Sequence, residues 1–272
     1  MSRIHLSTKT MKTINELHKD NKCIVVGNAW DPMSALIMEQ QGFNLIGTTS
    51  WGVANSLGYQ DGEIISFDEY LKVIKNILSV ISIPLSVDVE SGFSINKEEI
   101  IDNVLTLAKL GCSGVNLEDS TKEYQLKPKQ EFSELLKDLR SILDNANFQD
   151  FFINARTDTY IALQERQLEE TLERAALYEK SGANGIFVPL MSDKNDIKSL
   201  LSRITLPLNI MSLPNITDIE ELKEIGVRKY SFGNAMSDAI ISTIENFSKS
   251  VLEAKNTKEL YLHGNLRTKF MN

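Results

Sequence analysis

Short apolar runs rich in β-branched residues alternate along this chain with longer stretches in which apolar positions recur every three to four residues. The short runs are typical of buried strands, and the longer stretches have the period of amphipathic helices. The predicted strands are Cys23–Ala29, Leu45–Ser50, Pro84–Glu90, Gly114–Asp119, Phe151–Arg156, Gly185–Leu190, Pro207–Met211 and Tyr230–Gly233. The predicted helices include Phe67–Val80, Lys97–Leu110, Gln130–Leu143, Gln167–Ser181 and Asp218–Ile225.

Eight strand–helix units predict an α/β fold, a (β/α)8 TIM barrel formed as one domain by residues 1–272. The competing arrangement is an open, doubly wound sheet. It would need a glycine-rich phosphate loop after the first strand, and Gly27–Asp31 reads Gly-Asn-Ala-Trp-Asp, which is not such a loop. The closed barrel is therefore the predicted fold.

Both ends of the chain carry helical patterns outside the repeating units. A helix near Met11–Lys19 is expected to cap the barrel. A second helical pattern, Ala239–Ala254, is followed by a polar tail to Asn272, which is more chain than a single barrel needs. A projecting terminal helix usually packs on another copy, so we expect residues 238–272 to contact a neighbouring subunit of a homo-oligomer.

Composition excludes several classes of function. The 272 residues are 42% hydrophobic and 24% charged, with a net charge of -8, which argues against nucleic-acid or anionic-membrane partners. No apolar stretch approaches the roughly 18 residues of a membrane span, and no signal-peptide core begins the chain, so a cytoplasmic protein is expected. Cys23 and Cys112 are predicted to be reduced packing residues.

The histidines narrow the possible chemistry further. There are three, His5, His18 and His263, and all lie near the termini. A histidine-based triad or a histidine zinc site therefore has nothing to work with unless a terminus folds inward. Carboxylates, arginine, tyrosine, serine and a metal ion must carry any chemistry.

Acidic residues close several of the predicted strands. Asp88 and Glu90 are two positions apart and so point to the same side of their strand. Two carboxylates facing a barrel interior are too costly to bury without a cation, which favours a divalent metal. Glu118 and Asp119 are consecutive and point to opposite sides, so one of them is structural or begins the loop. Asp61, in an earlier loop, is by itself more typical of a solvated acid.

Other polar residues stand at strand ends with open roles. Arg156 either clamps a substrate carboxylate or balances the acids, and the pattern favours neither. The segment after the second strand, Thr48-Thr49-Ser50-Trp51-Gly52, could present hydroxyl and backbone N–H groups to an oxyanion, or be a plain serine-rich turn. Asn28 and Asn209 could line the site or form turns.

Six ordered motifs give the chain a resemblance to a known superfamily. They are Asn28-Ala29-Trp30-Asp31, Gly47-Thr48-Thr49-Ser50, Leu57-Gly58-Tyr59-Gln60-Asp61-Gly62, Asp88-Val89-Glu90-Ser91-Gly92-Phe93, Gly114-Val115-Asn116-Leu117-Glu118-Asp119 and Asn154-Ala155-Arg156-Thr157-Asp158. The chain resembles the isocitrate lyase/phosphoenolpyruvate mutase superfamily, especially its short, carboxyphosphonoenolpyruvate phosphonomutase-like branch.

The resemblance implies a barrel whose eighth helix is swapped between neighbours in a dimer of dimers. It also implies Mg²⁺ or Mn²⁺ bound to a small α-oxycarboxylate substrate, with an enolate of pyruvate type as the intermediate. Asp88 would ligate the metal directly, and Asp61, Glu90 and Glu118 would hold its waters. Arg156 and Ser50, with Thr49, Trp51 and Gly52 around it, would bind the substrate, and Asn28 and Asn209 would line the site.

The chain departs from the family in the loop after the fourth strand, which we call the gate (residues 120–128). It reads Ser-Thr-Lys-Glu-Tyr-Gln-Leu-Lys-Pro and lacks the cysteine and histidine of isocitrate and methylisocitrate lyases and the asparagine of the mutases. Val188-Pro189-Leu190 stands where the lyases carry an acid, and Glu90 replaces an aspartate. Tyr124 and Lys122 are the obvious proton donors in the gate. The alternative is that they are a packing tyrosine and a solvated loop lysine; beside an enolate, with a tuned pKa, Tyr124 would act as a general acid.

Three functions remain open at this stage. The first is Mg²⁺-dependent cleavage of a C–C bond in a small α-keto or α-hydroxy acid, as in a lyase or decarboxylase, with Arg156, Tyr124 and Glu118 as catalytic residues. The second is C–P chemistry, as in phosphonopyruvate hydrolysis or a mutase, for which Lys122, Lys127 and Lys129 are the available cations. The third is a non-catalytic protein that binds an α-keto acid.

Overall fold

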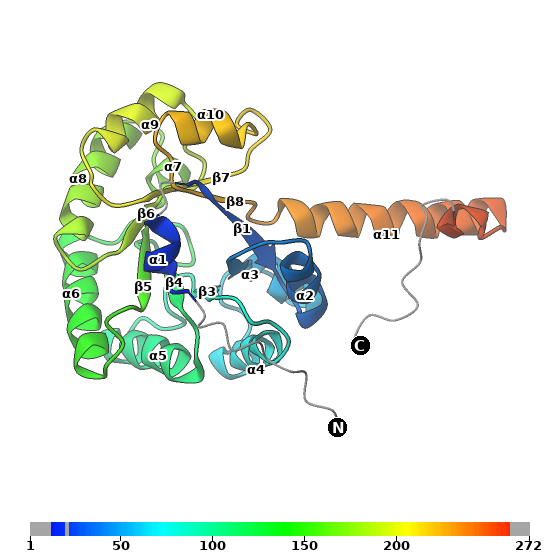
Figure 1. The fold of residues 1–272 in the computed structure, drawn as a ribbon, viewed down its shortest axis with the longest axis horizontal. Coiled ribbons are helices and arrows are strands. Elements are labelled where there is room, and N and C mark those ends of the chain that lie inside the picture. The colour runs from blue at the N-terminus through cyan, green and yellow to red at the C-terminus, as the bar shows by residue number, and fades with distance from the viewer. Residues whose placement is uncertain (1–11, 20–21, 262–272) are drawn as a thin grey trace. The chain divides into compact units, whose positions relative to one another are not determined.

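The computed structural model describes residues 12–19 and 22–261, and it confirms the predicted (β/α)8 barrel. His5 and His263 lie outside the described residues, as do Met11 and the tail from residue 262. Eight parallel strands close in chain order, with helices around them (Figure 1). The strands are β1 Ile24–Ala29, β2 Ile46–Thr48, β3 Leu85–Asp88, β4 Gly114–Glu118, β5 Phe152–Arg156, β6 Gly185–Phe187, β7 Leu208–Met211 and β8 Lys229–Ser231.

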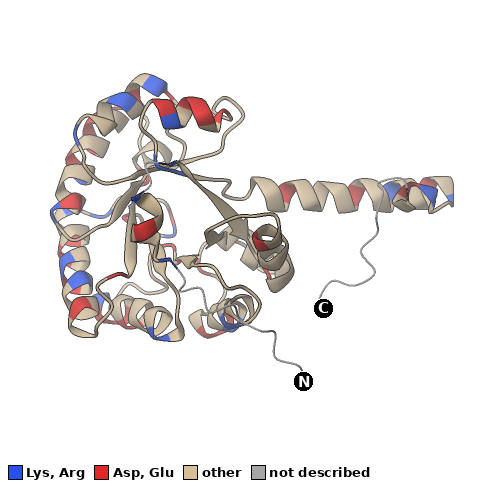
Figure 2. Ribbon diagram, in the orientation of Figure 1, with Lys and Arg blue, Asp and Glu red and all other residues tan. Residues whose placement is uncertain are grey.

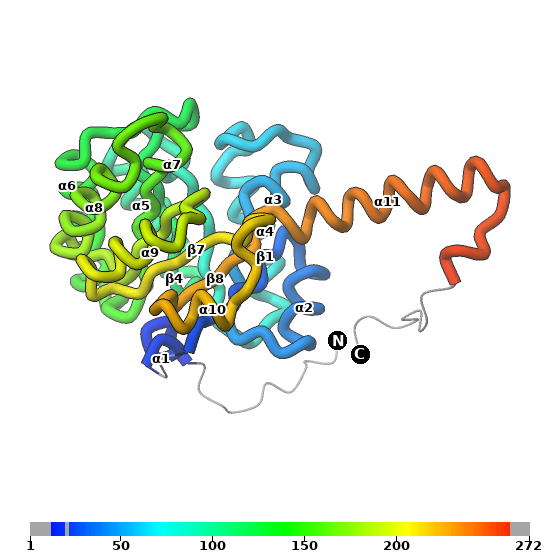
Figure 3. Tube along the Cα trace, turned by 90° about the horizontal axis from the view of Figure 1, so that it is seen from above, coloured from blue at the N-terminus to red at the C-terminus, as the bar shows by residue number. Residues whose placement is uncertain are grey.

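The helices of the barrel cover its outer wall. Their bounds are α1 Ile14–His18, α2 Pro32–Gln40, α3 Ser50–Ser56, α4 Phe67–Leu78, α5 Lys97–Leu110, α6 Lys129–Asn145, α7 Thr159–Ala162, α8 Gln167–Glu179, α9 Lys194–Leu201 and α10 Ile219–Glu224. Seen from above, α6 and α8 lie side by side (Figure 3). Most of the charged residues lie on helices, whereas the strands carry few (Figure 2). Apolar side chains such as Val104, Leu136 and Ile186 fill the space between strands and helices.

The observed elements differ from the predicted ones mainly at the ends of strands. The strand predicted to reach Ser50 ends at Thr48, because Thr49 caps a helix that begins at Ser50. The strand predicted to reach Leu190 ends at Phe187, before Pro189, which has no N–H for a ladder. Apolar residues in the loops that follow the strands extended the hydrophobic runs and made the predicted strands too long.

The amino end of the barrel is closed by α1, as predicted. The Ile14 side chain is fully buried and lies against Gly114 at the start of β4. The His18 ring stacks on Phe152 with their centroids 5.4 Å apart, and the Nζ of Lys229 lies 5.5 Å from the centroid of the same phenyl ring. Burial, then the positive charge of Lys229, lowers the pKa of His18 to about 3. His18 therefore folds inward, but at the end of the barrel opposite the carboxyl ends of the strands.

The chain divides into two compact units, the barrel up to Gly233 and a second unit from Asn234 onward. The second unit contains α11 (Ala235–Ala254), which begins four residues before the predicted Ala239, and a short 3-10 helix, η1 (Lys258–Tyr261). Several large apolar side chains of α11 are exposed, among them Ile244 at 60% and Leu252 at 66%. None of the described helices has the length and apolar character needed to cross a membrane. Both cysteines are unpaired, and Cys112 is buried.

Candidate active site

Arg156 joins two buried carboxylates at the carboxyl end of the barrel. The register of β4 and β5 sets Glu118 opposite Arg156, and the Nη1 of Arg156 lies 2.8 Å from the Oε2 of Glu118. The Nε of the same guanidinium lies 2.6 Å from the Oδ1 of Asp158, which is fully buried. Arg156 thus balances charge in this structure, which is one of the two roles that its position in the sequence left open.

Asp88 ends β3 on a backbone that two neighbours hold in place. Its N–H donates to the Oγ1 of Thr48 over 2.8 Å, and its carbonyl oxygen accepts from the hydroxyl of Tyr70 over 2.7 Å. The hydroxyls of Thr48 and Tyr70 also lie 2.8 Å apart. Burial raises the pKa of Asp88 to about 6, opposed by Arg156 and reinforced by the negative charge of Asp61.

Asp61 and Glu90 face the same region from two different loops. Burial raises the pKa of Asp61, whereas a hydrogen bond from the Ser50 side chain lowers it. Burial, then the charges of Asp61 and Asp88, raises the pKa of Glu90 to about 8. Asp61 is therefore drawn into the acid cluster, where the sequence alone indicated a solvated loop residue.

The acid cluster leaves oxygen atoms unsatisfied. The Oδ1 atoms of Asp61 and Asp88 and the Oε2 of Glu118 are buried without a hydrogen bond, although the last faces Arg156. Buried polar atoms without partners are uncommon in folded proteins. Among the described residues, no three Asp, Glu, His or Cys side chains converge closely enough to hold an ion by direct contact alone. These oxygens fit a Mg²⁺-like ion, which takes one or two carboxylates and keeps several waters.

The segment around Ser50 forms the start of α3. Thr49 caps this helix, with its Oγ1 accepting from the N–H of Gly52 over 3.4 Å. A Cβ on Gly52 would lie 2.9 Å from the Cβ of Trp30, so the close packing here requires glycine. The Trp51 side chain is 41% exposed. In this structure the N–H of Gly52 serves the cap, while Ser50 faces the acid cluster through its hydrogen bond to Asp61.

Asn28 and Asn209 connect strands inside the barrel. The Oδ1 of Asn28 accepts from the N–H of Phe232 over 2.7 Å. The Oδ1 of Asn209 accepts from the Nδ2 of Asn154 over 3.2 Å, and its own Nδ2 donates to the Oγ of Ser231 over 3.1 Å. Both side chains are thus buried and hydrogen-bonded within the barrel rather than placed in turns.

Asp119 points away from Glu118, as the alternation of the strand predicted, and it organises the outer side of the site. Its carboxylate accepts from the Thr157 hydroxyl (2.7 Å), the Asp158 N–H (3.0 Å), Arg174 (2.9 Å) and the Tyr178 hydroxyl (2.7 Å). The structural member of the Glu118–Asp119 pair is therefore Asp119.

Two site residues were missed by the sequence analysis. The hydroxyl of Ser120 is fully buried and lies 2.5 Å from the Oδ2 of Asp158 and 3.2 Å from the Oε1 of Glu118. The Oε1 of Glu63 accepts from the Ser91 hydroxyl over 2.8 Å and from the Phe93 N–H over 2.9 Å. Ser120 directly follows a predicted strand and Glu63 lies in a loop, but no sequence motif assigns either side chain a role. Only the folded loops show these contacts.

The gate folds as a compact turn. Ser120 and Leu126 form an antiparallel bridge, and the N–H of Thr121 donates to the carbonyl of Gln125 over 2.9 Å. Tyr124 is half-exposed, and burial and then the charge of Asp61 raise its pKa. Lys127 is partly buried, where Glu118 and Glu63 oppose the lowering of its pKa by burial. Tyr124 and Lys127 therefore sense the charges of the site, and Lys122 is exposed.

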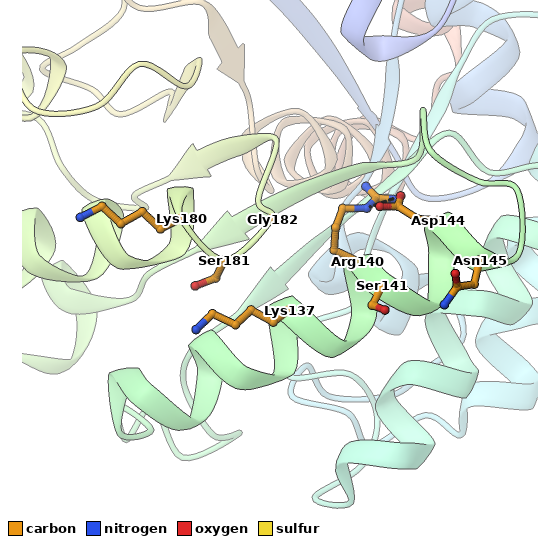
Figure 4. A pocket seen from close by; sticks show the side chains of 8 residues that line it. All are labelled: Lys137, Arg140, Ser141, Asp144, Asn145, Lys180, Ser181 and Gly182. Atoms are coloured by element: carbon orange, nitrogen blue, oxygen red, sulfur yellow. Dashed lines mark ion pairs between the residues drawn. The ribbon is translucent and has the colours of Figure 1, made fainter.

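A hollow of about 460 Å³ lies on the outer wall, away from these residues (Figure 4). Arg140 lines it and donates to the carbonyls of Phe151 and Phe148, over 2.9 and 2.8 Å, and pairs with Asp144. This arginine holds the backbone that leads into β5, so we assign its side of the hollow a structural role.

The chain matches the family model described as phosphoenolpyruvate phosphomutase over residues 14–252. It therefore belongs to the phosphoenolpyruvate mutase family, within the isocitrate lyase/phosphoenolpyruvate mutase superfamily of enzymes. It is 30% identical to 2-methylisocitrate lyase of Escherichia coli, over 74% of this chain and 68% of that protein. It is 28% identical to oxaloacetate decarboxylase of Pseudomonas entomophila, over 83% of this chain and 79% of that protein.

Solved structures share the barrel. A protein of Burkholderia cenocepacia, provisionally named a phosphonomutase, is 31% identical and superposes with a TM-score of 0.82, covering 86% of this chain and 97% of that one. Phosphonopyruvate hydrolase in complex with oxalate and Mg²⁺ superposes with a TM-score of 0.81 at 21% identity, covering 93% of this chain and 90% of that one. The first confirms the family resemblance, and the second shows a common fold.

Proposed function

We propose that this protein is a Mg²⁺- or Mn²⁺-dependent lyase that cleaves a C–C bond in a small α-keto or α-hydroxy acid. The observation that carries the proposal is the buried cluster of Asp61, Asp88, Glu90 and Glu118 around Arg156, in which the Oδ1 atoms of Asp61 and Asp88 are buried without a hydrogen bond and the Oε2 of Glu118 meets only Arg156. The named activities of the lyase and decarboxylase relatives support the same class of reaction.

Asp88 is the residue best placed to ligate the metal, because a hydrogen bond that its N–H donates to Thr48 and one that its carbonyl accepts from Tyr70 fix its backbone. Asp61, Glu90 and Glu118 would hold the metal's waters. When bound, the ion supplies Lewis-acid stabilisation to negative charge that develops on the substrate oxygens. Ser50 at the start of α3 would face the same oxygens, with Thr49, Trp51 and Gly52 shaping that side.

The reaction needs little else from the protein. In an α-keto acid the bond between C3 and the departing carbon breaks, and its electron pair forms an enolate of pyruvate type. The departing carbon leaves as carbon dioxide from a carboxylate, or as an aldehyde once its hydroxyl proton has passed to a carboxylate of the acid cluster. In an α-hydroxy acid the C2–C3 bond breaks instead: the C2 hydroxyl proton passes to the same cluster, C2 becomes a carbonyl, and the electron pair stays on C3. C3 then takes a proton, for which Tyr124 is the donor in this proposal. Arg156, held by Glu118 and Asp158, orients the substrate carboxylate.

C–P chemistry is a second candidate, favoured by one observation. Lys127 lies in the gate close enough to feel the charges of Glu118 and Glu63, and an ammonium there would bind the oxygens of a phosphoryl group. Comparing turnover of phosphonopyruvate and oxaloacetate by the same preparation separates the two candidates. Turnover of phosphonopyruvate alone would replace the C–C proposal with the C–P one.

Titration of oxalate in a calorimeter, with and without Mg²⁺, tests the site itself. Oxalate is a planar mimic of the pyruvate enolate. We expect binding that requires Mg²⁺ and is lost in Asp88→Ala, whereas Asp102→Ala, an exposed acid on α5, should bind as the wild type does. If oxalate binds equally well without metal or in Asp88→Ala, the metal site is wrong and a non-catalytic binding protein becomes the better description.

The second unit suggests how copies assemble. We propose that α11, within residues 238–272, packs on a neighbouring subunit in a cytoplasmic homo-oligomer, a dimer of dimers in which this helix is exchanged. Ile240, Ile241, Ile244 and Leu252 are between 42% and 66% exposed on this helix. Exposed apolar side chains grouped on one element commonly mark a protein–protein contact.

A further inference from the structure

At the carboxyl end of the barrel, which we call the mouth, the side chains at the strand ends change from charged to apolar between β5 and β6. Register pairs Glu118 with Arg156 and Arg156 with Phe187, so these three residues lie side by side on adjacent strands. The Cζ of Arg156 lies 5.9 Å from the centroid of the Phe187 ring. The guanidinium therefore has carboxylates on one side and an aromatic face on the other.

The apolar character continues in the loops after β6 and β7. Residues 188–192 and 212–217 contain no ionisable side chain. The acids that follow, Asp193 and Asp218, are used as helix caps: Asp193 accepts from the N–H of Asn195 over 2.7 Å, and Asp218 accepts from the N–H of Glu221 over 3.0 Å. No charged group of these two loops is thus left to meet a charged ligand.

These two loops also have a defined shape. The Nδ2 of Asn215 donates to the Oγ of Ser192 over 3.0 Å, which ties one loop to the other. Leu190 has a φ of +62° and its side chain is 42% exposed. A branched apolar residue rarely adopts this left-handed conformation, and strained positions of this kind cluster at ligand-binding sites. The loop therefore holds an apolar side chain open to solvent at a conformational cost.

The opposite half of the mouth carries all the charge described above. Asp61, Asp88 and Glu118 come from the loops and strands between β2 and β4, and Arg156 follows on β5. A small acid whose head is bound beside Arg156 would have Phe187 of the next strand as its neighbour on the far side, with the loop that carries Leu190 following that strand. A second carboxylate or a phosphonate on its far end would lose its hydration with no cation to replace it.

We propose that the substrate is an α-keto acid with a hydroxyl on C4 whose remaining substituent on C4 is uncharged and apolar, such as an alkyl chain lying over β6 and β7, so that cleavage of the C3–C4 bond releases an aldehyde. This inference rests on the proposed function, since it takes the acid head to be bound by the metal and Arg156. It names the substrate class that the proposed function leaves open, and it disfavours oxaloacetate and phosphonopyruvate as the best substrates.

Three unreactive probes test the substrate class with the full-length protein and Mg²⁺. Oxalate presents the acid head alone, N-propyloxamate adds an apolar chain, and N-oxalylglycine adds a carboxylate at a similar distance. We expect calorimetry to show that N-propyloxamate binds about tenfold more tightly than N-oxalylglycine. The first probe buries methylene groups, whereas the second buries a carboxylate that has no partner.

Substitutions locate the effect. Leu190→Arg should narrow or reverse the preference, because it supplies a cation beside the distal group. The matched control is Ile95→Arg in the fully exposed loop after β3, which should leave the preference unchanged. If Leu190→Arg fails to fold, Leu190→Asn provides the second variant, because asparagine tolerates the left-handed conformation and removes the apolar side chain. It should reduce the advantage of N-propyloxamate.

The two proposals fail in different ways. If oxalate binds only with Mg²⁺ but N-oxalylglycine binds as tightly as N-propyloxamate in the wild type, the apolar substituent is wrong and the metal site stands. If oxalate shows no metal-dependent binding, the proposed function fails and the substrate class fails with it.

Discussion

The guanidinium of Arg174 lies 2.9 Å from the carboxylate of Asp119, and both side chains are buried. Asp119 in turn accepts from the N–H of Asp158, the acid that holds Arg156. A helix on the outer wall is therefore connected to the candidate site through two carboxylates.

Arg174→Met should strongly destabilise the barrel, because it leaves Asp119 charged and buried without its cation. Loss of one partner of a buried ion pair typically costs about 3–5 kcal/mol. Urea unfolding followed by circular dichroism measures the loss. Arg166→Met removes an exposed arginine from the amino end of the same helix and should leave the midpoint unchanged; an equal loss in both variants would contradict the role given to Asp119.

Metal binding should raise the melting temperature of the wild type. A ligand that binds only the folded state adds about 2.7 kcal/mol of stability at a concentration of one hundred times its Kd. Asp88→Asn should abolish the increase with Mg²⁺ or Mn²⁺, while Asp102→Asn should retain it. Differential scanning fluorimetry with and without each ion makes the comparison, and an unchanged response of Asp88→Asn would remove Asp88 as the ligand.

Tyr124→Phe should reduce turnover of any substrate found, with little effect on oxalate binding. Loss of a general acid typically slows a reaction by about 10²–10⁴-fold. Steady-state kinetics on the variant and on Lys122→Met, which alters an exposed gate residue, separates a proton donor from a general effect of the gate. Intact turnover in Tyr124→Phe would exclude this residue as the donor.

The free energy of unfolding should fall at acidic pH because His18 is buried in its neutral form. Its pKa is about 3 in the folded protein and 6.5 for an ordinary histidine, so the unfolded chain binds the extra proton between these values. Stability from neutral His18 is present above about pH 6.5 and falls as the pH drops toward 3, by up to about 1.4 kcal/mol per pH unit. Urea unfolding of the wild type and His18→Phe at several pH values should show the wild type losing stability relative to the variant as the solution is acidified. A constant difference would contradict a buried, neutral His18.

Truncation before Asn234 should reduce the size of the assembly, if α11 packs on a neighbouring subunit. Ile244→Glu should act in the same direction without shortening the chain, and Asn246→Glu, an exposed polar position of the same helix, should not. Analytical ultracentrifugation gives the masses. An unchanged mass for both the truncated chain and Ile244→Glu would place the contact elsewhere.

The sequence predicted the barrel and the alternation of its strands, since both follow from local periodicity. The opposite directions of Glu118 and Asp119 follow from the same rule. The partners of Asp119 could not be predicted, because Arg174 and Tyr178 reach it only after α8 packs beside α6. Glu63 and Ser120 were missed for a similar reason: their roles come from loop conformations, and no spacing in the sequence indicates them.

The bridge between Ser120 and Leu126 has a consequence for the binding of a ligand. A loop that is already folded loses little conformational freedom when a ligand arrives, so less of the binding energy is spent on ordering it. The gate is also joined to the barrel where the N–H of Lys127 donates to the carbonyl of Asp119 over 2.8 Å. The turn is thus ordered and tied to the strand that carries Glu118 before any ligand arrives, so a ligand that contacts Tyr124 would meet a gate that is already formed.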